Sequence, residues 1–174
     1  MSGTLDRAGR VTYLPYVAPG WGVGELVFRD DVPIHHQEPS AARAIPATAT
    51  PRSPLQALLI ERLGAYFAGE RVSFADVDLG PTLALVGATP FEADCVRALQ
   101  RVPYGETLSY GDLAVLAGRP RAARGAGRAC AHGTLSVLVP YHRVIRADGT
   151  IGEFGPDGVG LKRRMLALEG VVLP

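Results

Sequence analysis

The sequence predicts an α/β N-terminal unit, made of a small sheet and one helix, followed by a mainly α C-terminal domain with a helix-turn-helix. Strand-like runs occur near the start of the chain, whereas helical periodicity and helix-capping residues dominate after Thr89. Charge is also uneven, because six arginines and no acidic residue lie between Arg119 and Arg146. A basic stripe of this kind favours phosphate as a partner. We place the two domains at residues 1–85 and 86–174.

Length and composition are those of an ordinary globular protein. The 174 residues are 47% hydrophobic and 20% charged, with a net charge of +1. No apolar run approaches the ~18 residues of a membrane span, and the first residues lack the apolar stretch of a signal peptide. With two cysteines outside any spaced framework, we expect a cytoplasmic protein that has reduced thiols and no membrane partner. Lys162 is the only lysine among 18 basic residues, which suggests a GC-rich bacterial genome.

The N-terminal unit is predicted from a hairpin and a helix. Residues 11–17 and 21–29 have strand patterns around a Pro-Gly turn. Residues 30–54 carry five prolines and are predicted as a long surface loop. Within it, His35 and His36 have no second ligand pair nearby, so we expect a solvated pair rather than a metal site. The remaining expectations are a helix from the Ser53 cap to Phe67, an edge strand at 77–79 and a linker at 80–89.

The C-terminal unit is predicted from successive helix caps. Thr89 caps a helix whose apolar stripe makes Cys95 a core residue, and Ser109 caps the next helix. After the break at residues 118–120, a helix over 121–132 carries three arginines spaced three and four apart, on one face. Two helices joined by a glycine-containing turn, the second with basic residues, are typical of a helix-turn-helix. Nucleic acid would lie on that face, which consists of Arg121, Arg124 and Arg128.

A cluster of three polar side chains follows a short apolar run. Residues 137–139 are predicted as a buried strand that ends at Pro140, since proline cannot donate a ladder hydrogen bond. Tyr141, His142 and Arg143 then form a turn before Val144 and Ile145 return to the core. The alternative is a structural turn with packed tyrosine, carbonyl-bonded histidine and solvated arginine. An extended piece at 151–154, a loop at 155–158 and a helix at 159–169 complete the chain.

Several ordered motifs carry a resemblance to a known family. They are Thr89-Pro90-Phe91, residues 102–111 (VPYGETLSYG), Ala122-Ala123-Arg124, residues 139–145 (VPYHRVI), Asp148-Gly149, Lys162 and Leu168-Glu169-Gly170. Together they resemble the O6-alkylguanine-DNA alkyltransferase family closely over residues 89–170. The N-terminal half matches only in its strand-strand-helix layout.

The resemblance implies a DNA-binding domain that turns a damaged guanine out of the duplex. The family then moves the alkyl group irreversibly to the cysteine of a Pro-Cys-His-Arg motif. By position, Tyr110 is similar to the residue that rotates the target phosphate, and Arg124 to the arginine that fills the vacated base stack. His142 and Glu169 match the pair that deprotonates the cysteine through water, and Lys162 braces the site. The implied DNA contacts also include Arg121, Arg128 and Arg143, and the implied base pocket consists of Tyr141, Val144, Phe154 and Gly155.

Two departures from the family pattern alter the expected chemistry. Tyr141 stands where the family has its cysteine, and Gly133 and Thr134 stand where it usually has asparagine and proline. A phenol titrates near ~10 against ~8.5 for a thiol, and its oxygen lies farther from the backbone. Cys130, on the predicted recognition helix, suits packing better than catalysis. The zinc cysteines of some relatives have no counterpart, so we expect no metal and no cofactor.

We therefore expect a non-enzymatic sensor, similar to the alkyltransferase-like proteins. It would bind double-stranded DNA that contains alkylated guanine, work as a monomer and hand the lesion to nucleotide excision repair proteins. An aromatic wall could stack on the flipped base. One alternative is an alkyltransferase that uses Tyr141 or Cys130, and another is a helix-turn-helix transcription regulator. The direction of the Tyr141 side chain is the observation that bears most on these alternatives.

Overall fold

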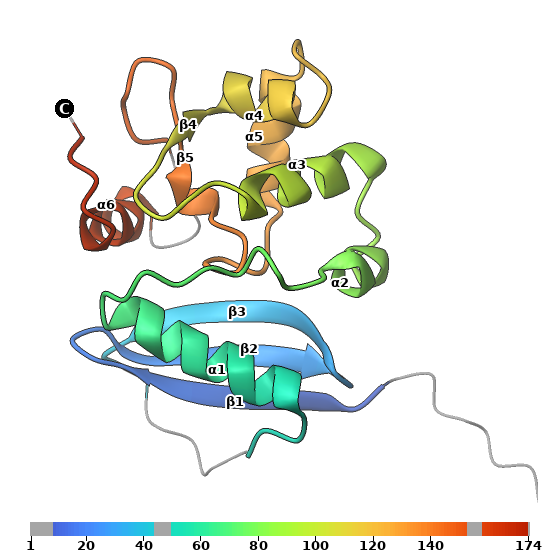
Figure 1. Cartoon of the computed structure of the whole chain (residues 1–174), viewed down its shortest axis with the longest axis vertical. Helices are drawn as coiled ribbons and strands as arrows, with labels where there is room; N and C mark the ends of the chain where they lie inside the picture. The colour runs from blue at the N-terminus through green and yellow to red at the C-terminus, as the bar shows by residue number, and fades with distance from the viewer. Residues whose placement is uncertain (1–8, 44–49, 153–157, 174) are drawn as a thin grey trace, which may run out of the picture.

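A three-stranded antiparallel sheet forms one end of the molecule, and helices form the other (Figure 1). This computed structural model describes residues 9–43, 50–152 and 158–173. The sheet consists of β1 (Val11–Ala18), β2 (Gly22–Arg29) and β3 (Val32–Ser40), in that order. The predicted hairpin is confirmed, with Tyr13 opposite Val27 across β1 and β2.

The third strand was not predicted, because residues 30–54 were assigned to a loop. A tight turn with Asp30 at a φ of 55° leads into β3, which pairs antiparallel with β2. Pro33 and Pro39 lie within β3, but β3 is an edge strand, where proline is tolerated because one side of the strand needs no donors. The prolines that suggested a loop are therefore compatible with a strand at this position.

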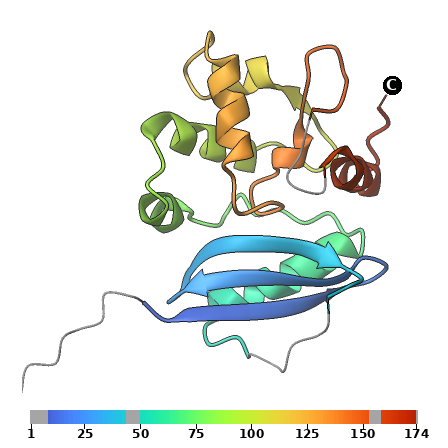
Figure 2. The same cartoon turned by 180° about the vertical axis from the view of Figure 1, so that it is seen from behind.

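Helix α1 (Pro54–Phe67) packs on one face of the sheet and forms the N-terminal core with it (Figure 1). Its predicted start is confirmed, because the Ser53 side chain accepts a hydrogen bond from the Gln56 N–H. In the described part of the chain no helix covers the opposite face of the sheet, as Figure 2 shows. The fully buried side chains between the helix and the sheet include Leu14, Leu26, Phe28, Leu59 and Leu63.

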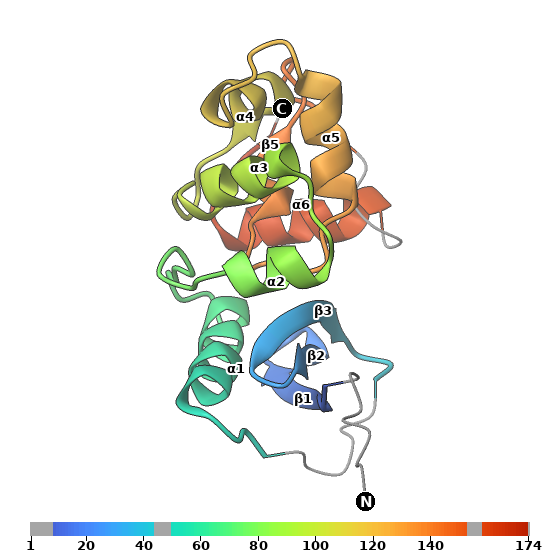
Figure 3. The same cartoon turned by 90° about the vertical axis from the view of Figure 1, so that its right-hand side faces the viewer.

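The segment after α1 was predicted as a strand and a linker, and both predictions are wrong. No strand forms at residues 77–79, and a short helix, α2 (Gly80–Leu85), occupies the supposed linker. The Asp78 carboxylate accepts a hydrogen bond from the Gly80 N–H and so starts the turn. Thr82 then donates to the carbonyl of Pro33 in β3, which fixes α2 between the sheet and α3 (Figure 3).

The helical C-terminal part follows the predicted caps. Both α3 (Pro90–Gln100) and α4 (Tyr110–Leu116) begin with complete capping boxes, Thr89 with Glu92 and Ser109 with Asp112. Helix α5 (Ala123–Ala131) packs against α4, as the helix pair predicted from the sequence requires. The remaining elements are the parallel strands β4 (Leu108–Ser109) and β5 (Val144–Ile145), and helix α6 (Gly158–Leu168).

Residues 137–139 form a buried turn rather than the predicted strand. A single bridge joins Ser136 to Val139, and Val137 adopts a φ of 73°. A positive φ in a β-branched residue is unfavourable, on the order of 1–3 kcal/mol, and persists only where the surroundings impose it. The apolar run is buried because the turn lies inside the core, so hydrophobicity alone could not distinguish it from a strand.

None of the helices described is long and apolar enough to cross a membrane. The predicted architecture, a small α/β unit followed by a helical domain, is confirmed. The division at residue 85 stays a prediction.

Candidate functional site

A single 3₁₀ turn, η1 (Tyr141–Arg143), holds the three polar side chains that the sequence singled out. All three are buried, and Pro140 precedes the turn. The side chains do not converge on one point. His142 and Arg143 reach Glu169, just beyond α6, whereas Tyr141 lines a pocket beside α2 and α3.

The first half of the site is a buried cluster around the Glu169 carboxylate. Oε1 accepts from Nε2 of His142 at 2.6 Å and from the Arg143 guanidinium at 3.0 Å. Oε2 accepts from Nε of Arg143 at 2.9 Å and from the Gly105 N–H at 3.0 Å. Burial alone would raise the pKa of Glu169, but hydrogen bonds from His142 and Arg143 hold this pKa well below its ordinary value. Glu169 is therefore ionised inside the protein.

Tyr66 on α1 completes this cluster and was missed in the sequence. Its hydroxyl donates to Glu169 Oε1 at 2.8 Å and lies 3.2 Å from His142 Nε2. Burial and the charge of Glu169 raise the pKa of Tyr66 well above its ordinary value, so the phenol stays protonated and donates. The sequence indicated only that Tyr66 lies on the apolar side of an amphipathic helix, and its partner is 103 residues away.

The geometry fixes which nitrogen of His142 carries the proton. An ionised carboxylate can only accept, so Nε2 must donate to Glu169, and Nδ1 is left with its lone pair. Among the described residues, Nδ1 of His142 is the buried side-chain atom without a hydrogen-bond partner. Burial, above all, lowers the pKa of His142. The imidazole is thus a neutral base whose proton-accepting nitrogen is unoccupied.

The structure corrects the assignment of Arg143 as a DNA contact. Only 7% of Arg143 is exposed, and its guanidinium is held by Glu169 and by the carbonyl of Val102. A buried arginine paired in this way cannot reach phosphate without breaking the cluster, which is strongly unfavourable. Arg143 therefore has a structural role in positioning Glu169.

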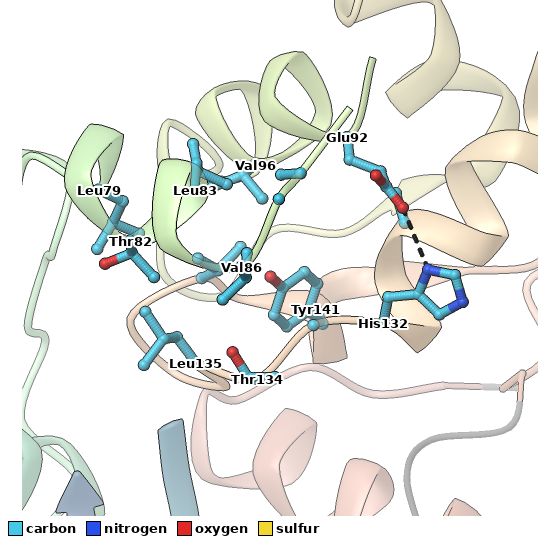
Figure 4. A pocket seen from close by; sticks show the side chains of 15 residues that line it. Leu79, Thr82, Leu83, Val86, Glu92, Val96, His132, Thr134, Leu135 and Tyr141 are labelled. Carbon is cyan, nitrogen blue, oxygen red and sulfur yellow. Dashed lines mark hydrogen bonds and ion pairs between the residues drawn. The ribbon is translucent and has the colours of Figure 1, made fainter. Parts of the chain in front are cut away.

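The second half of the site is Tyr141, which packs beneath Gly133. A Cβ atom added to Gly133 would lie 2.7 Å from the Tyr141 hydroxyl oxygen and would overlap two ring carbons. The ring is 7% exposed and reaches in among side chains of α2 and α3 (Figure 4). Burial, above all, raises the pKa of Tyr141. Tyr141 is consequently a neutral phenol at neutral pH and a poor nucleophile.

The two thiols are no better suited to accept an alkyl group. Burial raises the pKa of Cys130 on α5 to about 12 and that of Cys95 on α3 to about 11. Thiol reactivity requires the thiolate, which is scarce at neutral pH when the pKa is this high. Cys95 is fully buried, as predicted from the apolar stripe of its helix.

The exposed arginine surface (Arg121, Arg124 and Arg128) lies at and just before α5. Tyr110, the first residue of α4, has its ring close to Gly127 of α5 and its hydroxyl close to Gly152. Lys162 donates to the carbonyl of Val144 and lies 6.0 Å from the centre of the Tyr110 ring. Burial lowers the pKa of Lys162 to about 8. Phe154 and Gly155, the other expected pocket residues, lie outside the described residues.

The structure also corrects the expectation that His35 and His36 are both solvated. His35 is exposed as predicted, but His36 is buried between Tyr16, at 2.6 Å, and Ser136, at 3.0 Å. Its backbone N–H donates to the carbonyl of Thr134, so β3 is attached to the segment that leads to Tyr141. Within the described ranges there is no group of three or more His, Cys, Asp or Glu that could hold a metal ion.

Comparisons with known proteins identify the family to which this fold belongs. The family model for the 6-O-methylguanine DNA methyltransferase DNA-binding domain matches residues 90–171. The Mycobacterium tuberculosis O6-methylguanine methyltransferase structure is 34% identical, with a TM-score of 0.68, and the match covers 92% of this chain and 93% of that chain. This chain belongs to the O6-alkylguanine-DNA alkyltransferase family. The likeness extends across the N-terminal sheet, which the sequence motifs did not reach.

Curated family members match somewhat less than two thirds of the chain. The methylated-DNA–protein-cysteine methyltransferase of Mycolicibacterium paratuberculosis is 44% identical over 110 residues, which cover 63% of this chain. The match spans 62% of the length of that relative. The M. tuberculosis OGT in complex with DNA matches with 34% identity and a TM-score of 0.68, over 91% of this chain and 92% of that chain.

Proposed function

We propose that this alkyltransferase-family protein recognises O6-alkylguanine in duplex DNA without removing the alkyl group. The observation that carries the proposal is Tyr141 at the acceptor position, buried and protonated. Alkyl transfer to this chain would need a good nucleophile near His142. The phenol and both thiols have raised pKa values, so none of them supplies one at neutral pH.

Exposed basic residues support the binding part of this proposal. The arginine surface (Arg121, Arg124 and Arg128) is exposed at and just before α5, and salt-dependent contact with phosphates follows from such a surface. A DNA-bound structure of the M. tuberculosis relative supports the same use of this fold. Turning a base out of the stack is least unfavourable for damaged or weakly paired bases, so binding can be selective without chemistry.

In this proposal, Tyr110 and Arg124 act at the flipped nucleotide, and Lys162 supports the pocket wall at Val144. The cluster of His142 and Glu169 then has a structural role, because no thiol faces it. Recruitment of nucleotide excision repair proteins, a monomeric state and a cytoplasmic location remain predictions of this proposal.

The test compares fluorescence anisotropy of two duplexes that differ only in one O6-methylguanine, at fixed salt. We expect tighter binding to the lesion duplex and no change in the intact mass of the protein after incubation. Equal affinity for both duplexes would rule out lesion recognition. A stoichiometric gain of one methyl group would instead show an active alkyltransferase.

Two variants separate base recognition from phosphate binding. Arg124→Ala should reduce the preference for the lesion duplex. Arg128→Ala should weaken binding to both duplexes equally and should lower the slope of log affinity against log salt concentration by about 1. Arg163→Ala is the matched control, because Arg163 is an exposed arginine on α6 and does not belong to the arginine surface. A preference for one undamaged sequence over another, with no lesion preference, would support the transcription-regulator alternative.

A further inference from the structure

The pocket that Tyr141 lines lies on the side of α5 that carries Ala129 and His132. Its volume is about 320 Å³, and it is bounded by α2, the start of α3 and the segment 133–135 (Figure 4). Of the residues that the family resemblance implies for the base pocket, its lining contains Tyr141 but not Val144. It therefore shares Tyr141 with the expected base pocket, and its other described lining residues are different.

The walls of this pocket suit a small organic molecule. Apolar side chains from α2, α3 and the 133–135 segment line it together with a comparable share of polar surface, and Glu92 is hydrogen-bonded to His132 on one side. Binding sites for small molecules combine apolar walls with a few placed polar groups. The volume is at the low end of their range, which limits the occupant to one or two rings. The main apolar residues are Leu79, Leu83, Val86, Val96, Leu135 and Val139.

The Tyr141 hydroxyl is the feature that points to a ligand. Tyr141 lines the pocket, and its hydroxyl has no hydrogen-bond partner among the described residues. Its oxygen is not among the fully buried unpaired atoms, so it faces the open pocket, where a ligand acceptor can replace water. The phenol is protonated, so it can donate to an acceptor in the pocket.

The charge of Glu92 disfavours anions in the pocket. The Glu92 carboxylate accepts from the Thr89 N–H, the Thr89 hydroxyl and His132, and these bonds lower its pKa to about 2. Because Glu92 is ionised at neutral pH, a negatively charged ligand would be repelled. The Tyr141 ring supplies an aromatic part of the pocket wall, against which a ligand ring can pack.

We propose that this pocket binds a small neutral aromatic molecule whose hydrogen-bond acceptor is held by the Tyr141 hydroxyl. Two features of this chain create the site. The tyrosine supplies the donor, and Gly133 leaves room for its ring. The proposal does not depend on lesion recognition, since its test contains no DNA.

The probe for the test is benzamide, which has one ring and a carbonyl acceptor. Methyl and aromatic NMR signals of the full-length protein should shift saturably at Val86, Leu135 and Tyr141, with a dissociation constant in the millimolar range. Benzoate should bind at least 10-fold more weakly because of the Glu92 charge. Tyr141→Phe keeps the ring but removes the donor, and should weaken benzamide binding about 3- to 10-fold.

Blocking variants complete the test. Val86→Trp should abolish binding by filling the pocket from α2, where Val86 is 52% exposed. Val115→Trp is the matched control, since Val115 is 55% exposed on α4 and does not line the pocket. The proposal is overturned if benzamide gives no saturable shifts up to its solubility limit, which would indicate water as the occupant. It is also overturned if Val86→Trp or Tyr141→Phe binds benzamide as the wild type does.

Discussion

Gly133 and Tyr141 occupy complementary space: a Cβ atom on Gly133 would overlap the Tyr141 ring and lie 2.7 Å from its hydroxyl oxygen. These are two of the positions at which this chain departs from the pattern of its family. Gly133 is not among the residues with positive φ, so glycine is needed there for space and not for backbone conformation. The large residue at the acceptor position is thus accommodated by the missing side chain at residue 133.

Gly133→Ala should lower the free energy of unfolding by about 1–3 kcal/mol, because the added methyl group forces the Tyr141 ring out of place. The measurement is urea denaturation at neutral pH. Adding Tyr141→Ala should remove most of the penalty of the alanine at 133, so the double-mutant cycle should give a coupling of about 0.5–3 kcal/mol. Gly160→Ala on α6 is the control, since its Cβ would meet nothing within 4 Å, and it should be neutral or slightly stabilising. Additive effects at 133 and 141 would contradict the complementary packing.

Tyr141→Cys should convert the protein into a single-turnover alkyltransferase. The change places a thiol beside His142, whose Nδ1 is unoccupied and whose Nε2 is already held by Glu169. Incubation with O6-methylguanine duplex followed by intact-mass measurement should show a gain of one methyl group.

Two controls accompany that experiment. Tyr141→Ser leaves a similar cavity without a thiol and should gain no mass. Tyr141→Cys combined with His142→Phe tests whether the histidine is needed. A folded Tyr141→Cys protein that binds the lesion but stays unmethylated would show that the arrangement of His142 and Glu169 no longer supports transfer.

Glu169→Gln should destabilise the protein at pH 7 by about 3–5 kcal/mol, because it leaves the Arg143 charge buried without its partner. The pKa of Glu169 is lower in the folded than in the unfolded state, so its contribution is present above pH ~4.3 and is lost as the pH falls below that value. Urea denaturation at pH 7 and pH 4 should therefore show a smaller pH effect in the variant. Tyr66→Phe, which removes one hydrogen bond of the same cluster, should cost only about 1–2 kcal/mol. Equal losses in the two variants would argue against a dominant Arg143–Glu169 pair.

His36→Gln should reduce the acid sensitivity of the fold. Burial, with smaller effects from neighbouring charges, lowers the pKa of His36 to about 3, whereas an unfolded histidine titrates near ~6.5. Between these values the unfolded state binds more protons, so stability falls as the pH is lowered, by up to about 1.4 kcal/mol per pH unit. Denaturation midpoints at pH 7 and pH 5 should differ less in His36→Gln than in the wild type. His35→Gln is the control on the same strand, because His35 is exposed, and an equal effect of both variants would exclude this role for His36.

Parts of the structure could be predicted from the sequence because their causes are local. The caps at Ser53, Thr89 and Ser109 and the periodic apolar residues after them specify where helices begin and which face is buried. The ordered motifs between residues 89 and 170 also predicted the family and the positions of Tyr141, His142 and Glu169 within its pattern.

Tertiary structure decided the features that depend on distant partners. Pro33 indicated a loop, but pairing with β2 places it in an edge strand. Arg143 was predicted as a DNA contact, but it is buried and paired with Glu169. The direction of Tyr141 was decided by the space at Gly133, eight positions earlier in the chain but in contact with it in the fold. Sequence patterns report local propensity and burial, whereas the environment of a side chain depends on which remote residues surround it. For that reason the sequence determined the family and its missing thiol, and only the fold decided where the replacing phenol lies.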